Sequence, residues 1–140
     1  MSDSSTTHTL DVRQPYFDLI KSGVKTIEGR AGLVAEDRGI HENYKLRESK
    51  YKQGDTLLFT LARSTTEDTG DAGIISCTIT DISFFASFED MLSSCGLLNC
   101  LPNINTLTEG VDVYRSFPGY EQREKDFGVV GIHLRVHGKL

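Results

Sequence analysis

The chain has 140 residues, of which 38% are hydrophobic and 25% are charged, a balance typical of a globular domain rather than of a disordered chain. A domain of this length buries about two-thirds of the surface that its unfolded chain exposes, so it can build a core without metal ions or disulfides. The formal net charge of -5 at pH 7, taken alone, argues against a partner as acidic as nucleic acid.

Positive charge is nevertheless concentrated in the first half of the chain. Residues 1–63 carry ten Lys or Arg and nine Asp or Glu, whereas residues 64–140 carry five and eleven. Within residues 21–52 eight basic residues accompany five acidic ones. This stretch could therefore face one anionic ligand, and the alternative is a solvated charged face without a partner.

The cysteines and the first ten residues indicate the cellular compartment in which the protein is expected. Cys77, Cys95 and Cys100 are odd in number and lack the C-x-x-C spacing of a zinc site, which favours a reducing compartment. Residues 1–10 are rich in Ser and Thr and contain neither a basic segment nor an apolar run. We therefore expect a cytoplasmic protein, with a nuclear location as the alternative, and no membrane association. Residues 1–9 should form a flexible tail and residues 10–137 the folded domain.

The first elements are a strand that ends near Val12, a helix, and a second short strand. Pro15 suits a first helical turn, and Gly23 is suited to the position that follows a helix. Between them, apolar residues recur at helical spacing, namely Tyr16, Phe17, Leu19 and Ile20. Residues 25–30 then show the alternation of a strand.

The middle of the chain predicts a long connection followed by a hairpin. Residues 31–51 are polar and too long for an ordinary loop, so they form either a lid or a short helix around residues 42–48. The Gly-Asp turn that ends at Asp55 precedes a nearly continuous apolar strand over residues 56–61. That strand should be central in the sheet and should pair with an alternating strand over residues 74–85.

The last third predicts two helices and a strand. Ser87 begins a capping box, so a helix should run from there to about Ser94. A second helix is expected over residues 106–115, interrupted by Gly110, and a final buried strand over residues 128–136. Together the elements predict an α+β domain built on a small barrel of about five to six strands with flanking helices.

Several segments resemble those of a known family. Residues 15–30, PYFDLIKSGVKTIEGR, closely resemble the first signature of the ASCH domain, a branch of the PUA-like superfamily. Later segments are similar to their ASCH counterparts in the same order, and they are Lys52–Asp55, Ser87–Leu92, Leu101-Pro102, Tyr114-Arg115 and Gly128–Ile132. The resemblance extends from about Leu10 to Val136.

The resemblance implies a PUA-like β-barrel with a cleft between the helix-to-strand signature and the later helical segment, and roles related to RNA. One branch of the family hydrolyses the acetyl amide of N4-acetylcytidine with a Lys, a Thr three residues later and a downstream Glu, and another member type is a ribonuclease. In this chain Lys25 stands at the Lys position, Glu28 stands at the Thr position, and the third position falls near Asn103.

Lys25 and Glu28 are the candidate catalytic residues. Lys25 can contact a phosphate or, if desolvation lowers its pKa, act as a base, and the alternative is a surface salt bridge. Glu28 can accept hydrogen bonds from an exocyclic amine or take part in proton transfer, and equally it can pair with Arg30. Strict alternation would put Lys25 and Glu28 on opposite faces of a strand, so Lys25 has to lie in the turn or beside a bulge for both to line one cleft.

The candidate ligand-binding residues come from two segments of the chain. Arg30 offers a planar fork to phosphate or carboxylate. The tyrosines could stack on a base or belong to the core. The full set comprises Tyr16, Lys21, Arg30, Tyr114, Arg115 and Ser116.

We expect neither a metal ion nor another cofactor. His133 and His137 are the closest pair of histidines, but four residues along a strand separate them by about 13 Å, too far to chelate one ion. The leading hypothesis is a domain that binds RNA or a nucleotide in a polar cleft. The alternatives are a hydrolase, either an N4-acetylcytidine amidohydrolase or a metal-independent ribonuclease, and a protein-interaction domain with a vestigial cleft.

Overall fold

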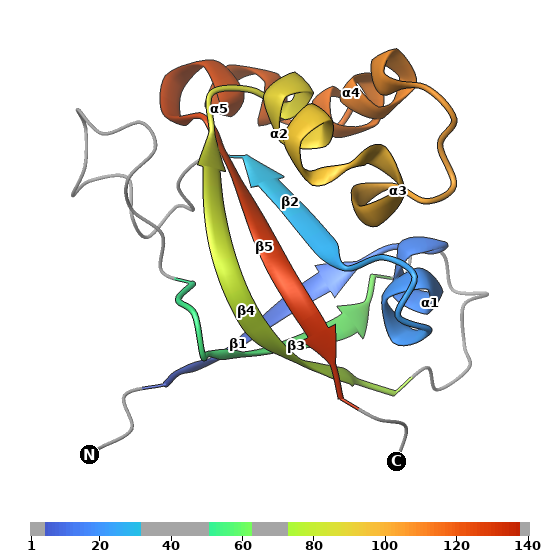
Figure 1. Cartoon of the computed structure of the whole chain (residues 1–140), viewed down its shortest axis with the longest axis vertical. Coiled ribbons are helices and arrows are strands. Elements are labelled where there is room, and N and C mark those ends of the chain that lie inside the picture. Colours follow the sequence, from blue (N-terminus) through green and yellow to red (C-terminus); the bar gives the residue numbers. More distant parts are fainter. Residues whose placement is uncertain (1–4, 32–50, 63–72, 138–140) are drawn as a thin grey trace.

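The computed structural model describes residues 5–31, 51–62 and 73–137, which form five strands and five helices (Figure 1). The strands are β1 (Thr7–Val12), β2 (Ile27–Ala31), β3 (Thr56–Leu61), β4 (Ile75–Phe85) and β5 (Val129–Val136). The helices are α1 (Tyr16–Lys21), α2 (Phe88–Cys95), α3 (Leu97–Cys100), α4 (Leu107–Arg115) and α5 (Tyr120–Phe127). The predicted α+β class is confirmed, and the predicted lid or helix within residues 31–51 lies almost entirely outside the described residues.

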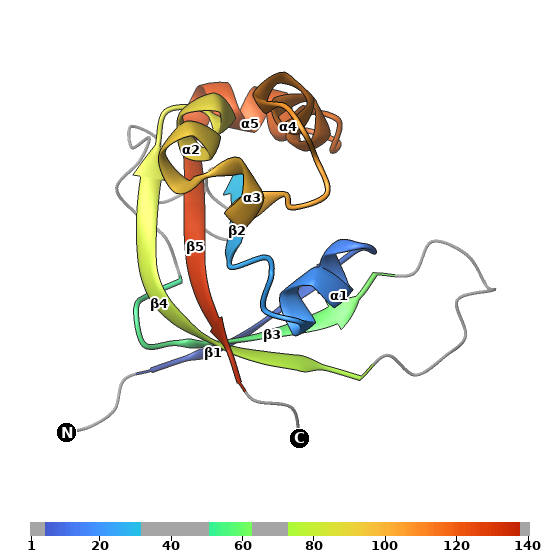
Figure 2. The ribbon, with the colours of Figure 1, turned by 45° about the vertical axis from the view of Figure 1, so that its right-hand side comes forward.

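The strands form a single sheet in the order β1-β3-β4-β5-β2. β1 is parallel to β3, and the other neighbours are antiparallel, including the predicted hairpin of β3 and β4. The sheet bends strongly, because β4, β5 and β2 run upright in Figure 2 while β1 and β3 cross below them. A register shift between Ile79 and Asp81 lies along β4. The expected barrel is, in the described residues, a five-strand half-barrel whose edges are β1 and β2.

Side-chain caps begin the two predicted helices. The hydroxyl of Ser87 accepts a hydrogen bond from the Asp90 amide at 3.1 Å, and the hydroxyl of Thr106 accepts one from the Glu109 amide at 3.2 Å. Each cap satisfies a backbone donor that the first helical turn leaves free. The sequence therefore located the starts of α2 and α4.

Gly110 lies inside α4 without interrupting it, so the predicted break is wrong. A Cβ at Gly110 would lie 2.9 Å from Leu92 Cδ1 and 3.0 Å from Leu97 Cδ1. Glycine costs a helix about 1 kcal/mol relative to alanine, but here it lets α4 approach α2 closely. Packing between the helices offsets the lower helix propensity.

Two hydrophobic clusters support the half-barrel. The first lies between α1 and the sheet and includes Phe17, Ile20, Leu57, Phe59 and Ile79. The second joins the helices at the other end of the molecule to β2 and β5, and it includes Phe88, Met91, Leu92, Tyr114 and Val129. In Figure 1, α2 to α5 gather at one end of the sheet and α1 lies near the other. Tyr16 packs against both clusters, so it lies where they meet.

The described helices are short. α4 has nine residues, whereas crossing a bilayer takes about 20 apolar residues. No helix in the described residues is long and apolar enough to cross a membrane.

Candidate functional site

A cavity of about 240 Å³ lies at the seam between the two edge strands and below the helices. Its wall includes the last residues of β1 and further residues from α1, β2, α4 and α5. Five of the predicted site residues line it, and these are Tyr16, Lys25, Glu28, Arg30 and Tyr114. The structure therefore brings the helix-to-strand signature together with the later helical segment, as the resemblance implied.

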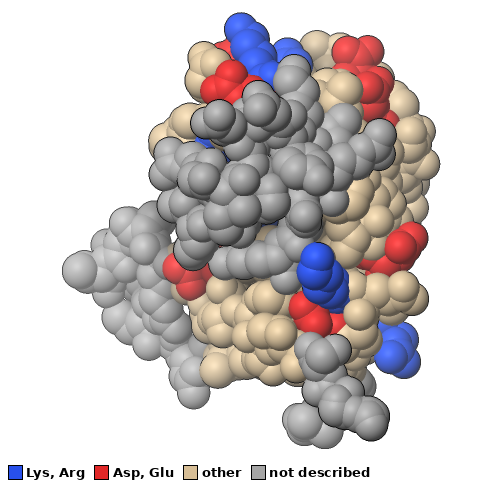
Figure 3. All heavy atoms as spheres, turned by 90° about the vertical axis from the view of Figure 1, so that its left-hand side faces the viewer, with Lys and Arg blue, Asp and Glu red and all other residues tan. Residues whose placement is uncertain are grey.

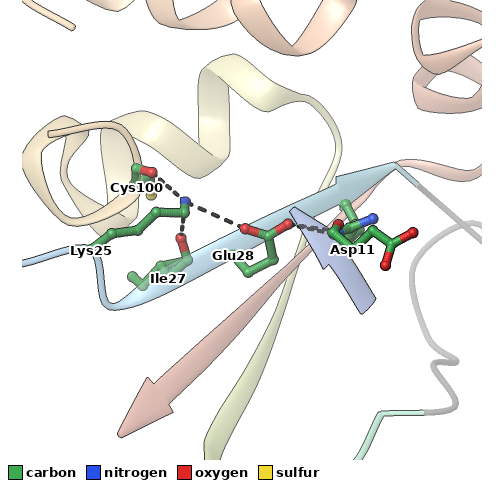
Figure 4. Close-up of polar contacts among 6 residues, drawn as sticks. Asp11, Lys25, Ile27, Glu28 and Cys100 are labelled. Carbon is green, nitrogen blue, oxygen red and sulfur yellow. Dashed lines mark hydrogen bonds and ion pairs between the residues drawn. The ribbon is translucent and has the colours of Figure 1, made fainter. Parts of the chain in front are cut away.

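Lys25 lies in the connection between α1 and β2, and 3% of the residue is exposed. The adjoining amide of Thr26 donates a hydrogen bond to the Asn99 carbonyl at 3.0 Å, which ties this connection to α3. Because Lys25 precedes β2, the alternation of side chains between the two faces of the strand does not place it on the opposite side from Glu28. Its side chain points back toward β2, as Figure 4 shows.

The Lys25 ammonium has three acceptors around it. Nζ donates to the carbonyl of Ile27 at 2.6 Å and to the carbonyl of Cys100, and it lies 3.5 Å from Oε1 of Glu28 (Figure 4). An ammonium has three N–H donors and no acceptor, so these three groups match its charged form. Burial nevertheless lowers the pKa of Lys25, although the Glu28 carboxylate opposes this effect. Lys25 is thus a fixed cation that holds its proton less tightly than a surface lysine does.

Glu28 connects Lys25 to Arg30. Its Oε1 faces Lys25, and its Oε2 accepts a hydrogen bond from Arg30 Nε at 2.8 Å and forms an ion pair with Arg30 Nη2 at 2.8 Å. Arg30 Nη2 also donates to the Asp11 carbonyl at 3.2 Å, which connects the two edges of the half-barrel. The predicted pairing of Glu28 with Arg30 is present, and a row of alternating charge lies along the cavity wall.

Tyr114 lines the cavity with a ring that is already stacked and a hydroxyl that is buried. Its ring stacks on Phe88 with centroids 4.4 Å apart and planes 3° apart, and 4% of the residue is exposed. Within the described residues, its hydroxyl has no hydrogen-bond partner. Burial raises the pKa of Tyr114 well above its ordinary value, so the hydroxyl stays protonated at neutral pH. An unpaired buried hydroxyl in a cavity wall suits a polar ligand atom.

Tyr16 forms another part of the wall. It is partly buried, and its ring centroid lies 5.6 Å from Lys25 Nζ, within the range of a cation–π contact. The ring therefore both packs against the core and helps to hold the buried cation.

The other three predicted residues do not line this cavity. Lys21 is exposed in the last turn of α1, and Ser116 donates a hydrogen bond to the Val113 carbonyl at the end of α4. Arg115 forms two hydrogen bonds to Glu124, at 2.8 Å and 3.2 Å. Glu124 also accepts a hydrogen bond from the Phe88 amide at 2.7 Å. Through Glu124, Arg115 therefore connects α4 to α5 and to the start of α2.

The ASCH domain family model matches residues 10–136. This chain belongs to the ASCH domain family. Two solved structures are similar to it over almost their whole length. The crystal structure of the hypothetical protein PH0355 has 31% identity and a TM-score of 0.68, covering 94% of this chain and 99% of that one. The solution NMR structure of protein PF0455 from Pyrococcus furiosus has 28% identity and a TM-score of 0.63, and the match covers 96% of this chain and 99% of that one. A search of the curated proteins found no significant match.

Several lining residues of this ASCH domain had not been identified from the sequence. They are chiefly Asp11, Arg13, Gly29 and Phe117. Two of them, Asp11 and Arg13, flank the end of the first predicted strand, and Phe117 directly precedes Pro118-Gly119. The sequence signal that could have identified them was the position of polar or aromatic residues at the ends of predicted elements, because binding residues often lie in the connections between elements.

The cysteines of this ASCH domain are poor nucleophiles. Cys100 is fully buried, and burial raises the pKa of its thiol to about 12. Cys77 is equally buried, with its pKa raised to about 12 by the same cause. Among the described residues, no group of three or more His, Cys, Asp or Glu is placed to hold a metal ion. The polar side chains that line the cavity include those of Lys25, Glu28, Arg30 and Tyr114.

One face of the molecule mixes positive and negative side chains (Figure 3). On this face, Lys and Arg side chains of the described residues lie at the top and at the lower right, with Asp or Glu near most of them. Residues 32–50 of the basic stretch lie outside the described residues. The cavity wall brings together three cations, Arg13, Lys25 and Arg30.

Proposed function

We propose that this ASCH domain binds RNA or a nucleotide and that the cavity receives one base. The observation that carries the proposal is the Tyr114 hydroxyl, which is buried in the cavity wall and has no partner among the described residues. The row of Lys25, Glu28 and Arg30 beside it supplies fixed charges. Convergent polar groups in an otherwise aromatic cavity are typical of a binding site.

The size of the cavity supports a small occupant. Pockets for drug-sized ligands measure about 300–1,000 Å³, and this one measures about 240 Å³. One base or nucleoside therefore suits the volume better than a stacked or paired segment. An RNA segment would have to present an unpaired base to it.

Recognition of the base would use hydrogen bonds at the buried side and aromatic contacts around it. Glu28 has about four lone-pair sites, so it can still accept from an exocyclic amine while Lys25 and Arg30 donate to it. The Tyr114 hydroxyl can donate to a ring nitrogen or carbonyl. Tyr16 and Phe117 supply apolar surface.

Binding is tested with a fluorescent single-stranded RNA and with nucleotides over a series of salt concentrations. We expect affinity that weakens as salt rises and drops in Lys25→Ala and Arg30→Ala, with circular dichroism to verify that each variant is folded. Lys21→Ala is the matched control, because Lys21 is an exposed lysine that does not line the cavity. Binding that is absent, independent of salt or equally weakened by Lys21→Ala would refute the proposal.

Hydrolysis is the second candidate function. It is favoured by one observation, namely that burial lowers the pKa of Lys25 while Nζ lies 3.5 Å from Glu28. In this hypothesis Lys25 is the base or the electrostatic stabiliser and Glu28 its partner. Asn103, at the third position of the amidohydrolase pattern, is exposed and does not line the cavity.

Turnover tests hydrolysis directly. Wild type and Lys25→Ala are incubated with N4-acetylcytidine and with labelled RNA, and the products are separated by chromatography. Product that depends on Lys25 would support an enzyme, whereas equal traces from both proteins would exclude it.

A protein-interaction domain with a vestigial cleft was the third hypothesis. It predicts a cleft filled by its own side chains. A cavity of about 240 Å³ with an unpaired hydroxyl in its wall supports ligand binding instead.

A further inference from the structure

Arg13 is an exposed residue of the cavity wall and lies in the connection between β1 and α1. Its guanidinium carbon lies 5.1 Å from the centroid of the Phe117 ring. Contact with an aromatic face orients a guanidinium and leaves its N–H groups free to donate at its edge. Arg13 is therefore held at the cavity without the use of its hydrogen-bond donors.

The other two cations of the wall already have a carboxylate partner. Lys25 and Arg30 both pair with Glu28. Within the described residues, by contrast, the Arg13 side chain makes no ion pair or hydrogen bond, and Phe117 is the contact that fixes it. An arginine held in this way is suited to an anionic group that arrives from solvent.

The charges around the cavity favour such a group despite the acidity of the whole chain. Its wall contains three cations, Arg13, Lys25 and Arg30, and two carboxylates, Asp11 and Glu28, which leaves one positive charge. Both carboxylates have partners, since Asp11 accepts a hydrogen bond from the Thr60 hydroxyl. Arg13 is the cation of the wall that has no carboxylate partner in the described residues, and it lies on the exposed side.

We propose that Arg13 binds the phosphate of the occupant, so that the cavity prefers a nucleoside monophosphate, or a phosphorylated nucleotide within RNA, to a free nucleoside. This inference rests on the proposed function, because the base has to enter between Arg13 and Tyr114. A guanidinium can offer a phosphate two parallel hydrogen bonds. The buried side of the cavity then selects the base, and Arg13 selects the phosphate.

The test compares nucleosides with their phosphates by isothermal titration calorimetry on the full chain. Adenosine, guanosine, cytidine and uridine are titrated alongside their 5′-monophosphates and inorganic phosphate. We expect at least one monophosphate to bind about tenfold or more tightly than its nucleoside, the usual gain from hydrogen bonds to a charged group. Inorganic phosphate alone should bind more weakly than that monophosphate, since it lacks the base.

Variants assign the preference to Arg13. Arg13→Gln should weaken the binding of the monophosphate by about tenfold or more and bring it to the level of the nucleoside. Arg13→Lys should have an intermediate effect, because it keeps the charge and loses the planar fork. Lys21→Gln is the matched control, as another exposed cation nearby in the sequence that does not line the cavity, and it should leave the preference unchanged.

The outcomes separate this inference from the proposed function. Equal affinity of a nucleoside and its monophosphate, or a phosphate preference that survives Arg13→Gln, would overturn the inference and leave the proposed function standing. Inorganic phosphate that binds as tightly as any monophosphate would also overturn it, by making Arg13 part of a general anion site. If nucleosides, monophosphates and RNA all fail to bind, the proposed function itself is refuted.

A titration with short single-stranded RNA distinguishes the two sources of the phosphate. If the occupant belongs to RNA, the RNA binds more tightly than any monophosphate, and Arg13→Gln reduces the salt slope by about 0.7, the value for one phosphate of a single strand. If the occupant is a free nucleotide, the monophosphate binds more tightly than the RNA. Both results support a phosphate contact at Arg13.

Discussion

The ammonium of Lys25 lies 3.5 Å from the carboxylate of Glu28, and 2% and 9% of these side chains are exposed. Neither group could be buried alone at acceptable cost, because isolated charges are expensive to remove from water. Arg30 and two backbone carbonyls complete the arrangement. The stability of the domain and the chemistry of its cavity are therefore coupled through the same atoms.

Replacement of Lys25 by Met should destabilise the fold. Two buried carbonyls lose their donor, and Glu28 keeps Arg30 as its remaining partner. We expect a loss of about 3 kcal/mol in the free energy of unfolding, the lower end of the range for breaking a buried ion pair. Urea-induced unfolding measures it. Lys21→Met, an exposed change, should cost within about 0.5 kcal/mol, and equal costs for the two variants would contradict the account.

The lowered pKa of Lys25 predicts a dependence of stability on pH. Burial holds this pKa below 10.5 in the folded protein, and the unfolded chain regains the ordinary value. Between the two pKa values the unfolded chain binds more protons, so the free energy of unfolding rises with pH.

The quantity to measure is the difference in the free energy of unfolding between wild type and Lys25→Met, from neutral pH to about 10.5. We expect this difference to shift in favour of wild type as pH rises. The subtraction removes the contribution of Tyr114, whose raised pKa acts in the opposite direction. A difference that is flat or falls with pH would show that the pKa of Lys25 is not lowered.

Gly29 and Gly131 face each other in the β2–β5 pair and offer a matched test of the cavity wall. A Cβ at Gly29 would lie 2.6 Å from Met91 Cε and 3.0 Å from the Tyr114 hydroxyl oxygen, whereas at Gly131 the nearest atom, in Phe85, is 3.5 Å away. We expect Gly29→Ala to cost about 1–3 kcal/mol, as overpacking does, and to reduce nucleotide binding. Gly131→Ala should do neither. Thermal unfolding and calorimetric titration measure both effects, and similar results for the two variants would count against the described wall.

Arg115 should matter for stability and not for binding. Its removal leaves Glu124, which is 4% exposed, with the Phe88 amide as its remaining partner in the described residues. We expect Arg115→Met to lower the free energy of unfolding by about 1–3 kcal/mol, the cost of an unsatisfied buried acceptor. Its nucleotide affinity should equal that of wild type. Ser116→Ala should change neither quantity. A stable Arg115→Met protein with weakened binding would restore Arg115 to the ligand site.

The fold was largely predictable where local signals agreed with tertiary packing. Caps at Ser87 and Thr106 located α2 and α4, and alternation located the β3–β4 hairpin. α5 was missed because its sequence, YEQREKDF, has no apolar stripe. Its buried position is Glu124, which the distant Arg115 and Phe88 satisfy. Such a helix depends on partners that periodicity does not reveal.

The candidate site was predictable in part. The ASCH signature located Lys25, Glu28 and Arg30, which the structure brings together at one cavity. Arg115 was placed with Tyr114 because they are neighbours in sequence, but successive residues of a helix point about 100° apart. Tyr114 faces the cavity, and Arg115 turns toward Glu124 instead. Arg13 was missed because its significance comes from a contact with Phe117, far away in the sequence.

The most direct measurement is the pair of effects produced by Tyr114→Phe. The variant deletes a buried hydroxyl that has no partner among the described residues, so unfolding in urea should show a protein as stable as wild type or more stable, by up to about 1–3 kcal/mol. Nucleotide affinity should fall by about threefold to tenfold, the loss of one hydrogen bond. Unchanged affinity would contradict recognition of a base by this hydroxyl, and a loss of stability above about 1 kcal/mol would show that the hydroxyl has a partner in the fold.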